Sequence, residues 1–452
     1  MKRSSLLLLS ILLAPQAVSA QTLPEALAQA YRHNPQLLGE RARQEATDEL
    51  VPQALAGWRP TIAFYGENGK EQERVKVKSN NRVTKGRANL DPNELALQAT
   101  QPLYRGGRLE AQTESAELQV QAGRHQLIAV EQNVLLSAVQ AYIDVSLAKA
   151  VVDVYREHEG VLRQTLISTQ GRRNQGAAAG TDVAQAEARL AQAQANRISY
   201  EGKHNAAREI YRQVIGEYPA NPTLPPNALL PYKSPEELVA AARGNPNVLA
   251  ATSAEAAARK DIDVARGARM PSVDLVGVMA RTYEEDTLGE RIWSRSVKLQ
   301  VTMPLYEGGM ISSKERQASK LLLQRRFAAD TARRGVESSA AQAWAIFASA
   351  RASREALDRQ LVAQGTARRG VEAGLRAGSN TTLDLLDADD ELAQARVQVQ
   401  QARHDEVLAS YQVLAAAGDL TAKALNLPVE LHDPTRNYDA VRNRWIGWGE
   451  GE

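Results

Sequence analysis

The sequence PLYRGG at residues 102–107 returns as PLYEGG at residues 304–309, 202 positions further along the chain. A later pair of segments keeps the same offset, because residues 190–193 match residues 392–395. Shared composition can produce one such match by chance, but not several in the same order at one spacing. The repetition therefore predicts an internal duplication of one structural plan.

Another match lies upstream of this motif at a different offset. Residues 23–35 match residues 234–246, a spacing of 211 positions. The first copy is thus nine residues longer, and the extra residues lie between Pro60 and Pro102, where a loop tolerates insertion. We predict a first repeat over residues 21–232, a second repeat over residues 233–427 and a C-terminal tail over residues 428–452.

The first twenty residues have the pattern of a secretory signal peptide. Lys2 and Arg3 form a basic start, residues 6–13 are an apolar run, and residues 18–20 are small enough for a cleavage site. The run is too short to span a membrane as a helix, and the whole pattern predicts export. We therefore assign residues 1–20 to a signal peptide and not to the mature fold.

The charges of the mature chain balance. The full sequence has 55 Lys and Arg residues against 53 Asp and Glu residues, and the surplus of two lies in the signal peptide. A neutral chain lacks the basic surplus of many nucleic-acid-binding proteins, so we expect no nucleic acid as a partner. The chain has no Cys, which excludes a zinc thiolate site, a cysteine nucleophile and a lipid-carrying cysteine.

No later segment is predicted to be a transmembrane helix. The most apolar candidate, residues 128–154, contains Glu131, Asp144, Lys149 and Asp153. Each of these charges is costly in a lipid core. If the chain crosses a membrane, we expect it to use β-strands.

Each repeat has the same predicted order of elements. A helix covers residues 23–57 in the first copy and residues 235–267 in the second, and a proline ends or follows it. Two alternating strands come next, and in the first copy they flank a polar loop rich in Asn and Lys. Such alternation is typical of membrane barrel strands, although a hairpin on a soluble sheet has the same pattern. The predicted strands contain residues 61–65, 95–100, 273–278 and 297–301.

A long helical pattern follows each PLY motif. Apolar residues recur every seven positions in the first copy, and a second stripe lies four residues on, which predicts a coiled-coil-like seam. The first stripe consists of Leu127, Val134, Ala141, Ala148, Tyr155 and Leu162. A helix over residues 107–170 is about 95 Å long, and helices of this length must pack side by side as a rod, bundle or tube. Breaks at residues 176–180 and 374–380 precede a return helix in each copy.

Four strands are too few to close a membrane barrel, for which eight is about the minimum. Their edges would be unpaired in lipid. Either the chain oligomerises, in which case a trimer supplies twelve strands and twelve long helices, or the strands lie outside the membrane.

This order of helix, hairpin and long helix pair, present twice, resembles the TolC family of outer-membrane efflux and secretion channels over residues 23–427. The resemblance implies a mainly α-helical protein with a membrane β-barrel. Long antiparallel helices would form a periplasmic α-barrel, and each protomer of a homotrimer would give four strands to a twelve-stranded barrel. Outer-membrane lipid, a periplasmic adaptor protein and an inner-membrane export pump, ABC-type or other, are the implied partners, and we expect no cofactor.

The most specific match is GSNTTLDLLDA at residues 378–388, which resembles the family's periplasmic entrance. It implies that Asp384 and Asp387 form an acidic ring when three copies assemble. A simpler interpretation is that these acids start a helix, where they suit the positive end of its dipole.

The resemblance also implies contacts that close the entrance, with Thr181 and Asp182 in the other turn. Members of the family carry Tyr and Arg at the positions of Leu375 and Asn380. Leu375 cannot donate a side-chain hydrogen bond and Asn380 has no charge, so the closed state must be held differently. Arg376 is a candidate partner for Asp182.

The PLY motifs are predicted to join barrel and tunnel. Proline suits neither mid-helix nor mid-sheet, and paired glycines allow a sharp change of direction. An ordinary loop would contain the same residues, but their presence in both copies favours a junction. The junction residues are Pro102, Gly106, Gly107, Pro304, Gly308 and Gly309.

Nothing in the sequence predicts catalysis, since the six His residues are scattered and neither a nucleophile elbow nor a phosphate-binding loop is present. We therefore predict a passive outer-membrane duct with a large periplasmic portion and no enzymatic activity. The C-terminal residues 420–425 and 438–445 resemble family members that serve type I protein secretion. Small-molecule efflux is the alternative, and a periplasmic coiled-coil protein without a pore is a distant one.

Overall fold

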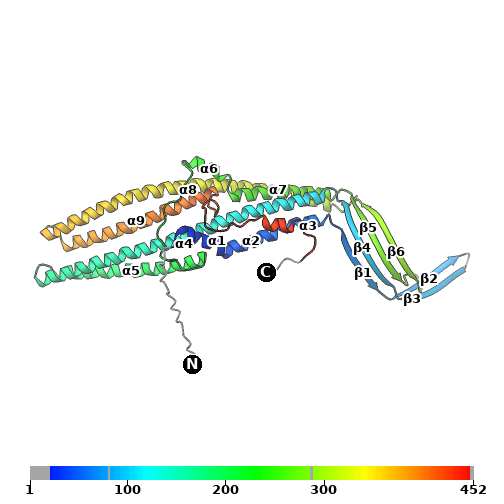
Figure 1. Ribbon diagram of the computed structural model, residues 1–452, viewed down its shortest axis with the longest axis horizontal. Helices are drawn as coiled ribbons and strands as arrows, with labels where there is room; N and C mark the ends of the chain where they lie inside the picture. The colour runs from blue at the N-terminus through cyan, green and yellow to red at the C-terminus, as the bar shows by residue number, and fades with distance from the viewer. Residues whose placement is uncertain (1–20, 80–81, 286–288, 448–452) are drawn as a thin grey trace, which may run out of the picture. The chain divides into compact units, whose positions relative to one another are not determined.

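The computed structural model describes residues 21–79, 82–285 and 289–447 (Figure 1). The predicted signal peptide lies outside these residues. The chain divides into two compact units, and each unit contains parts of both repeats. The helical unit comprises the described residues through Leu38, Ala129–Asn245 and Val336–Leu431, and the strand unit comprises Gly39–Ile128, Pro246–Gly335 and the chain from His432 onward.

The described chain is mainly helical, and its element order repeats as the duplication predicts. The first copy contains α1 (Leu23–His33), α2 (Pro35–Asp48), α3 (Leu50–Ala56), β1 (Thr61–Asn68), β2 (Glu71–Ser79), β3 (Arg82–Leu90), β4 (Asn93–Tyr104), α4 (Arg108–Asn174) and α5 (Gly180–Ile215). The second copy contains α6 (Pro235–Ala242), α7 (Pro246–Gly267), β5 (Ser272–Tyr283), β6 (Arg291–Thr302), α8 (Met310–Ala377) and α9 (Thr382–Ala417), and α10 (Arg436–Val441) follows.

The first helix of each copy is broken, so the prediction of one continuous helix was wrong. Asn34 has extended backbone between α1 and α2, and its side chain accepts a hydrogen bond from the Gln36 amide at 2.9 Å. A residue before proline is disfavoured in helical conformation, and Pro35 follows Asn34. Asn245 precedes Pro246 at the matching break between α6 and α7.

The strand unit confirms the four predicted strands and adds two. Strands β1, β4, β5 and β6 form one antiparallel sheet in that order. The segment predicted as a polar loop instead contains β2 and β3, which pair as a separate antiparallel hairpin. Polar composition hid these strands, because most of the side chains that the structure describes in them are exposed, with Leu90 a buried exception.

Most of the predicted heptad stripe of α4 is buried, whereas its member Tyr155 is half-buried. Leu127, Val134, Ala141 and Leu162 are each at most 5% exposed. The return helix α5 begins at Gly180 and α9 begins at Thr382, within about two residues of the predicted starts. The long helices are therefore specified by their apolar period and by the turns between them.

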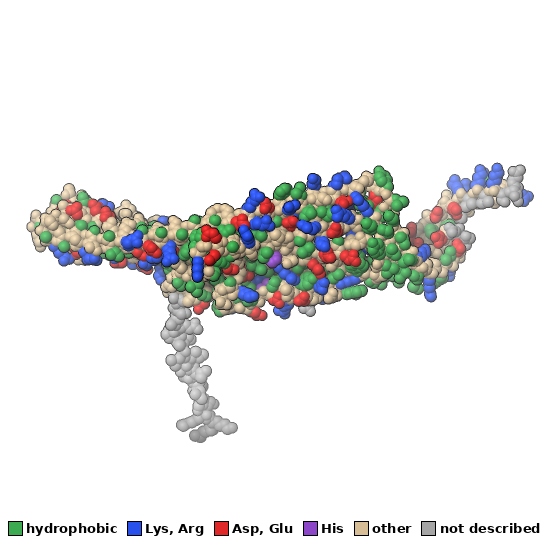
Figure 2. Space-filling model, turned by 90° about the horizontal axis from the view of Figure 1, so that it is seen from above, with side chains coloured by type: hydrophobic (Ala, Val, Ile, Leu, Met, Phe, Trp, Pro, Cys, Tyr) green, Lys and Arg blue, Asp and Glu red, His purple; other side chains and the backbone are tan. Residues whose placement is uncertain are grey.

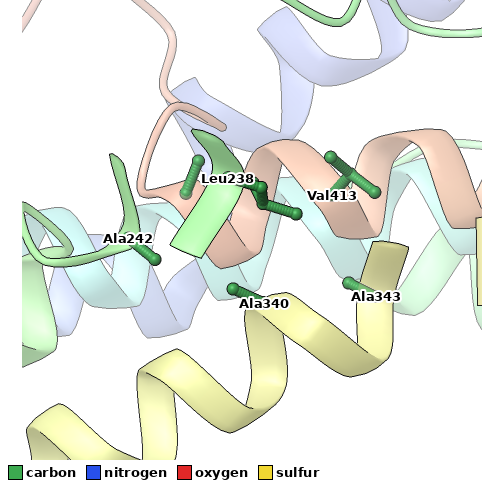
Figure 3. Close-up of a cluster of buried hydrophobic side chains, with 6 residues drawn as sticks. Leu238, Ala242, Ala340, Ala343 and Val413 are labelled. Carbon is green, nitrogen blue, oxygen red and sulfur yellow. The ribbon is translucent and has the colours of Figure 1, made fainter. Parts of the chain in front are cut away.

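The helical unit packs by means of small residues. Leu238 of α6 lies against Ala340 and Ala343 of α8 and Val413 of α9, and all four are at most 8% exposed (Figure 3). Alanine allows helix axes to approach closely, so one leucine fills the space between them. A second cluster joins Leu162, Ala186, Ala193 and Leu386, which come from α4, α5 and α9.

The C-terminal tail packs on the strand unit through Gly447, the last described residue. Tyr438 packs against a cluster that contains Val51 and Val120. Arg442 pairs with Glu117 at 2.9 Å, and the Arg59 guanidinium lies 5.0 Å from the centroid of the Trp445 ring. These contacts hold the tail against α3 and the first turns of α4.

Candidate functional site: an apolar sheet face and the helix tips

The four-stranded sheet has an exposed apolar face. Phe64 lies opposite Leu97, and Leu97 lies opposite Met279. Directly opposed residues point to the same side of a sheet. The exposed apolar side chains that share this face are Ile62, Phe64, Leu95, Leu97, Leu275, Met279, Trp293, Val297, Leu299 and Val301, and they are between 40% and 76% exposed. The same register also places polar residues on this face, among them Arg281, Arg295 and Gln101. An exposed apolar patch of this kind marks a surface that contacts lipid or another protein.

The opposite face of the sheet is mostly polar or small. It carries Thr61, Gln98, Thr100, Asp274, Ser294, Ser296, Lys298 and Gln300 by the same register. Alternation of apolar and polar residues with one face toward lipid and one toward water is the pattern of membrane barrel strands. The sheet is thus amphipathic in the way that the sequence predicts.

Both edges of the sheet are open in the described chain. β1 pairs only with β4, and β6 pairs only with β5, among the described strands. An edge strand presents unpaired backbone N–H and C=O groups. These edges are where a neighbouring copy can add its own strands.

The junction motifs turn the chain through left-handed glycines. Gly106 and Gly107 have φ of +65° and +74°, and Gly308 and Gly309 have φ of +61° and +86°. Pro304 lies between β6 and α8, whereas Pro102 lies inside β4, next to a register shift. A proline is tolerated there because the ladder is already interrupted.

The first junction is more crowded than the second. A Cβ atom on Gly106 would lie 2.3 Å from Cβ of Met270 and 2.8 Å from the Gly267 carbonyl oxygen, while one on Gly308 would meet nothing within 4 Å. Arg105 pairs with Asp274 of β5 at 2.8 Å. The first junction is therefore packed against the end of α7, and Gly106 is required by both space and backbone conformation.

The turn between α4 and α5 holds two of the predicted entrance residues. The Asp182 carboxylate accepts a hydrogen bond from the Ala179 amide at 3.0 Å and so caps α5, while Thr181 is exposed. Arg376 pairs with Glu372 on its own helix. In the single chain Arg376 therefore pairs with a residue one helical turn away and Asp182 with its own helix start, and a pairing of Arg376 with Asp182 between copies stays a prediction.

The turn between α8 and α9 holds Asp384, which forms a capping box with Thr381. Asp384 accepts from the Thr381 amide at 2.7 Å, and its own amide donates to the Thr381 hydroxyl at 3.1 Å. The Thr381 amide and then its hydroxyl hold the pKa of Asp384 below its ordinary value. The residue is also exposed, so its carboxylate both starts the helix and presents a negative charge to solvent.

Leu375 and Asn380 lie in the same turn and are half-buried. The Asn380 side-chain amide donates to the Val371 carbonyl at 3.4 Å. A Cβ atom on Gly374 would lie 2.9 Å from the Asn380 side chain. Asn380 therefore closes the turn on itself and makes no link to the α4–α5 turn within the chain.

Arg189 makes the link that the sequence did not reveal. Its guanidinium contacts Asp387 and Asp390 of α9 at 2.6 Å each, and it belongs to α5. Asp390 also lies 2.9 Å from Nε2 of His158 on α4. The cluster joins three long helices close to their tips. The spacing of the two acids puts them on one helix face, but a partner on another helix has no signature in sequence.

The described residues do not gather a set of metal ligands around these features. No group of three or more His, Cys, Asp or Glu residues arranged for a metal ion occurs among the residues that the structure describes. One described helix, α4, contains a window apolar enough to cross a membrane by length and composition, whereas the sequence predicted none. That window is 61% buried, which is the property of a core helix in this fold.

Comparison with known proteins identifies the family. The model of the outer membrane efflux protein family matches residues 26–217 and 238–420. The outer membrane efflux protein BepC of Brucella suis is 31% identical over 98% of this chain and 95% of its own length. The outer membrane protein TolC of Vibrio cholerae is 26% identical over 90% of this chain and 92% of its own length. The proteases secretion protein PrtF of Dickeya chrysanthemi is 25% identical over 93% of each chain.

Solved structures have the same fold. The crystal structure of CusC, described in terms of transmembrane channel formation, has a TM-score of 0.76 with 18% identity, over 88% of this chain and 92% of that one. The duplicated helix–hairpin–helix plan, the amphipathic four-stranded sheet and the paired long helices agree with this likeness. The chain belongs to the outer membrane efflux protein family of TolC-like channels, and its place is the outer membrane.

Proposed function

We propose that three copies of this chain form a passive exit duct through the outer membrane. The observation that carries the proposal is the amphipathic four-stranded sheet with two open edges. Four strands cannot close a barrel, whereas three sheets give twelve strands and leave no edge in lipid. The apolar face would then meet outer-membrane lipid, and the polar face would line the duct.

The duct would work with two partners. A periplasmic adaptor protein would dock on the long helices near their tips, and an inner-membrane pump, ABC-type or other, would supply energy and cargo. The resemblance to the family supports both partners. We infer that the duct itself does no catalysis, since the tips offer helix caps and ion pairs rather than an activated nucleophile or base.

We propose type I protein secretion as the main use of the duct. The tail segments at residues 420–425 and 438–445 resemble those of secretion members, and PrtF is by name a proteases secretion protein. Small-molecule efflux is the second candidate, and the name of BepC, an efflux protein, favours it. One duct can serve both, because cargo choice then lies in the pump.

A deletion strain tests both uses together. Secreted proteins in the medium are compared by mass spectrometry, and tolerance to dyes and antibiotics is measured in parallel. Loss of proteins from the medium supports secretion, new drug sensitivity alone supports efflux, and both defects indicate a shared duct. Wild-type secretion and tolerance together would contradict the proposal.

We propose that Asp384 and Asp387 form an acidic ring at the entrance of the trimer, with Thr181 and Asp182 in the facing turn. The low pKa of Asp384 keeps its charge at neutral pH, and rings of carboxylates favour cations. Asp384→Asn keeps an oxygen that can accept from the Thr381 amide but removes the charge. We expect weaker cation selectivity and weaker block by divalent cations in a planar bilayer.

The control for the ring is Glu391→Gln, which removes one exposed charge further along the same helix. We expect that variant to conduct like the parent. Unchanged selectivity in both Asp384→Asn and the double variant Asp384→Asn/Asp387→Asn would contradict the ring. The double variant also removes a partner of Arg189, so the single variant isolates the effect of charge.

A further inference from the structure

The hairpin of β2 and β3 lies at one end of the four-stranded sheet, opposite the end where the strands connect to helices. β1 begins after α3 and β4 runs into α4, so the hairpin joins the opposite ends of these two strands. Its base is held by two hydrogen bonds that backbone amides donate, one to a backbone carbonyl and one to a side-chain carboxylate. The Gly69 amide donates to the Pro92 carbonyl at 2.9 Å, and the Asp91 amide donates to the Glu284 carboxylate at 3.1 Å.

Register sorts the charges of this hairpin by face. Arg74 lies opposite Arg87, and Lys76 lies opposite Lys85. Opposed residues share a face and alternate residues along a strand do too, so Lys78 joins them. Gln72 and Asn89, which continue this face, share a hydrogen bond of 3.1 Å. One face thus carries five cationic side chains and no acid.

The acids of the hairpin cannot neutralise this face. Glu71 and Glu73 point to the other face, together with Arg82. All five cationic residues are exposed, and none of them forms a salt bridge with any carboxylate that the structure describes. Figure 2 shows Lys and Arg side chains gathered at this end of the strand unit. Like charges directly opposite each other destabilise a strand pair. The arrangement weakens the hairpin by itself, and an anion bound across both strands reverses that effect.

The location of the hairpin indicates which anionic groups its cationic face would meet. The chain is an outer-membrane protein whose long helices belong to the periplasm, and the hairpin is at the other end of the strands. That end faces the outer leaflet, which in this membrane is built from lipopolysaccharide with phosphate groups on its lipid A and inner core. We propose that the face formed by Arg74, Lys76, Lys78, Lys85 and Arg87 binds the phosphate groups of lipopolysaccharide.

The second repeat has no such extension. β5 ends at Tyr283 and β6 begins at Arg291, which leaves too few residues for a hairpin of this length. Each protomer therefore carries one cationic face, and a trimer presents three around the outer rim. Three faces bind a lipid layer more firmly than one because their contacts are linked.

Binding is measured with the full-length trimer in a nonionic detergent and fluorescently labelled deep-rough lipopolysaccharide. The test variant carries Arg74→Gln, Lys76→Gln, Lys85→Gln and Arg87→Gln. Each basic residue near an anionic lipid surface contributes about fivefold to binding, so we expect a loss on the order of a hundredfold or more. Sodium chloride weakens wild-type binding because salt screens exposed charges.

A matched control removes the same charge elsewhere in the strand unit. Lys314, Arg316, Lys320 and Arg326 of α8 are exposed, and their replacement by Gln leaves lipopolysaccharide binding unchanged. Lys76→Glu separates binding from folding, because it places opposite charges across the strands and stabilises the hairpin while it weakens binding. Lipopolysaccharide whose phosphates have been removed enzymatically does not bind.

Three results would overturn the proposal. The first is equal binding by the parent and the four-residue variant while both remain heat-modifiable trimers on gels. The second is equal binding of dephosphorylated lipopolysaccharide. The third is a hairpin-dependent association with polyglutamate but not with lipopolysaccharide, which would assign the face to an acidic protein.

Discussion

Replacing Arg189 with Gln removes the ion pairs that join α5 to α9 near the helix tips. Both contacts are 2.6 Å, and the side chains are 40% exposed for Arg189, 49% for Asp387 and 20% for Asp390. Exposed ion pairs contribute about 0.2–1 kcal/mol each. If these pairs are present only when the proposed entrance is closed, we expect them together to stabilise the closed state by about 1 kcal/mol in each protomer.

That value predicts the size of the effect on opening. A change of about 1 kcal/mol shifts an equilibrium constant about fivefold. If the three protomers open together, the contributions add to about 3 kcal/mol and the shift is on the order of a hundredfold. The open fraction of single channels in a planar bilayer therefore measures the contribution of the Arg189 ion pairs. It also shows whether the three protomers open together.

The matched control is Arg212→Gln. Arg212 also lies on α5, and it pairs at 3.0 Å with Glu209 of the same helix, so its removal loses an ion pair without freeing one helix from another. We expect the Arg189 variant to open more often and the Arg212 variant to behave as the parent. If the two variants have the same open fraction, whether changed or unchanged from the parent, the role of Arg189 in joining α5 to α9 is refuted.

Other predictions concern stability. Gly106→Ala should lower the free energy of unfolding by about 3 kcal/mol, because the new methyl group overlaps Met270 and the backbone φ is positive. Gly308→Ala has only the φ strain and should lower the free energy of unfolding by about 1 kcal/mol. Denaturant titration of both variants measures the difference. Leu238→Ala should cost about 3 kcal/mol because Leu238 is fully buried, and a melting temperature equal to that of the parent would contradict the packing of α6. Burial opposes the charged form of His404, but hydrogen bonds with Asp144 and Asp405 outweigh it and raise the pKa above 6.5. The resulting stability is present below pH 6.5 and is lost as pH rises through the raised pKa, so the advantage of the parent over His404→Gln should shrink between pH 6 and pH 9; an advantage independent of pH would show that His404 is not charged.

Sequence predicted the elements whose signals are periodic or repeated. The heptads of α4, the four amphipathic strands and the two junction motifs each have a local pattern that requires no partner to be seen. The hairpin of β2 and β3 was missed because its sequence is rich in charged and polar residues, so the alternation of apolar and polar residues is weak. The breaks at Asn34 and Asn245 had a local cause, the following proline, but the apolar pattern continued through them.

The contacts at the helix tips were predicted only in part. The capping role of Asp384 follows from Thr381 three residues earlier and is visible in sequence. The pairing of Asp387 and Asp390 with Arg189 joins residues about two hundred positions apart, and several Arg residues on the long helices were equally plausible partners. Charge alone does not choose among them, whereas the packing of α5 against α9 does.

The duplication, the repeated order of strands and long helices and the cysteine-free composition can be read from the sequence alone, which also predicts a signal peptide at residues 1–20. These properties follow from local order along the chain, where spacing and residue type are sufficient evidence. The ion-pair partners and the residues that share a sheet face became known only from the tertiary structure. The same holds for the clustering of the five cations of the β2–β3 hairpin on one face. Such pairings depend on strand register and helix contact, and a shift of one residue in register would have moved the same cations to the opposite face.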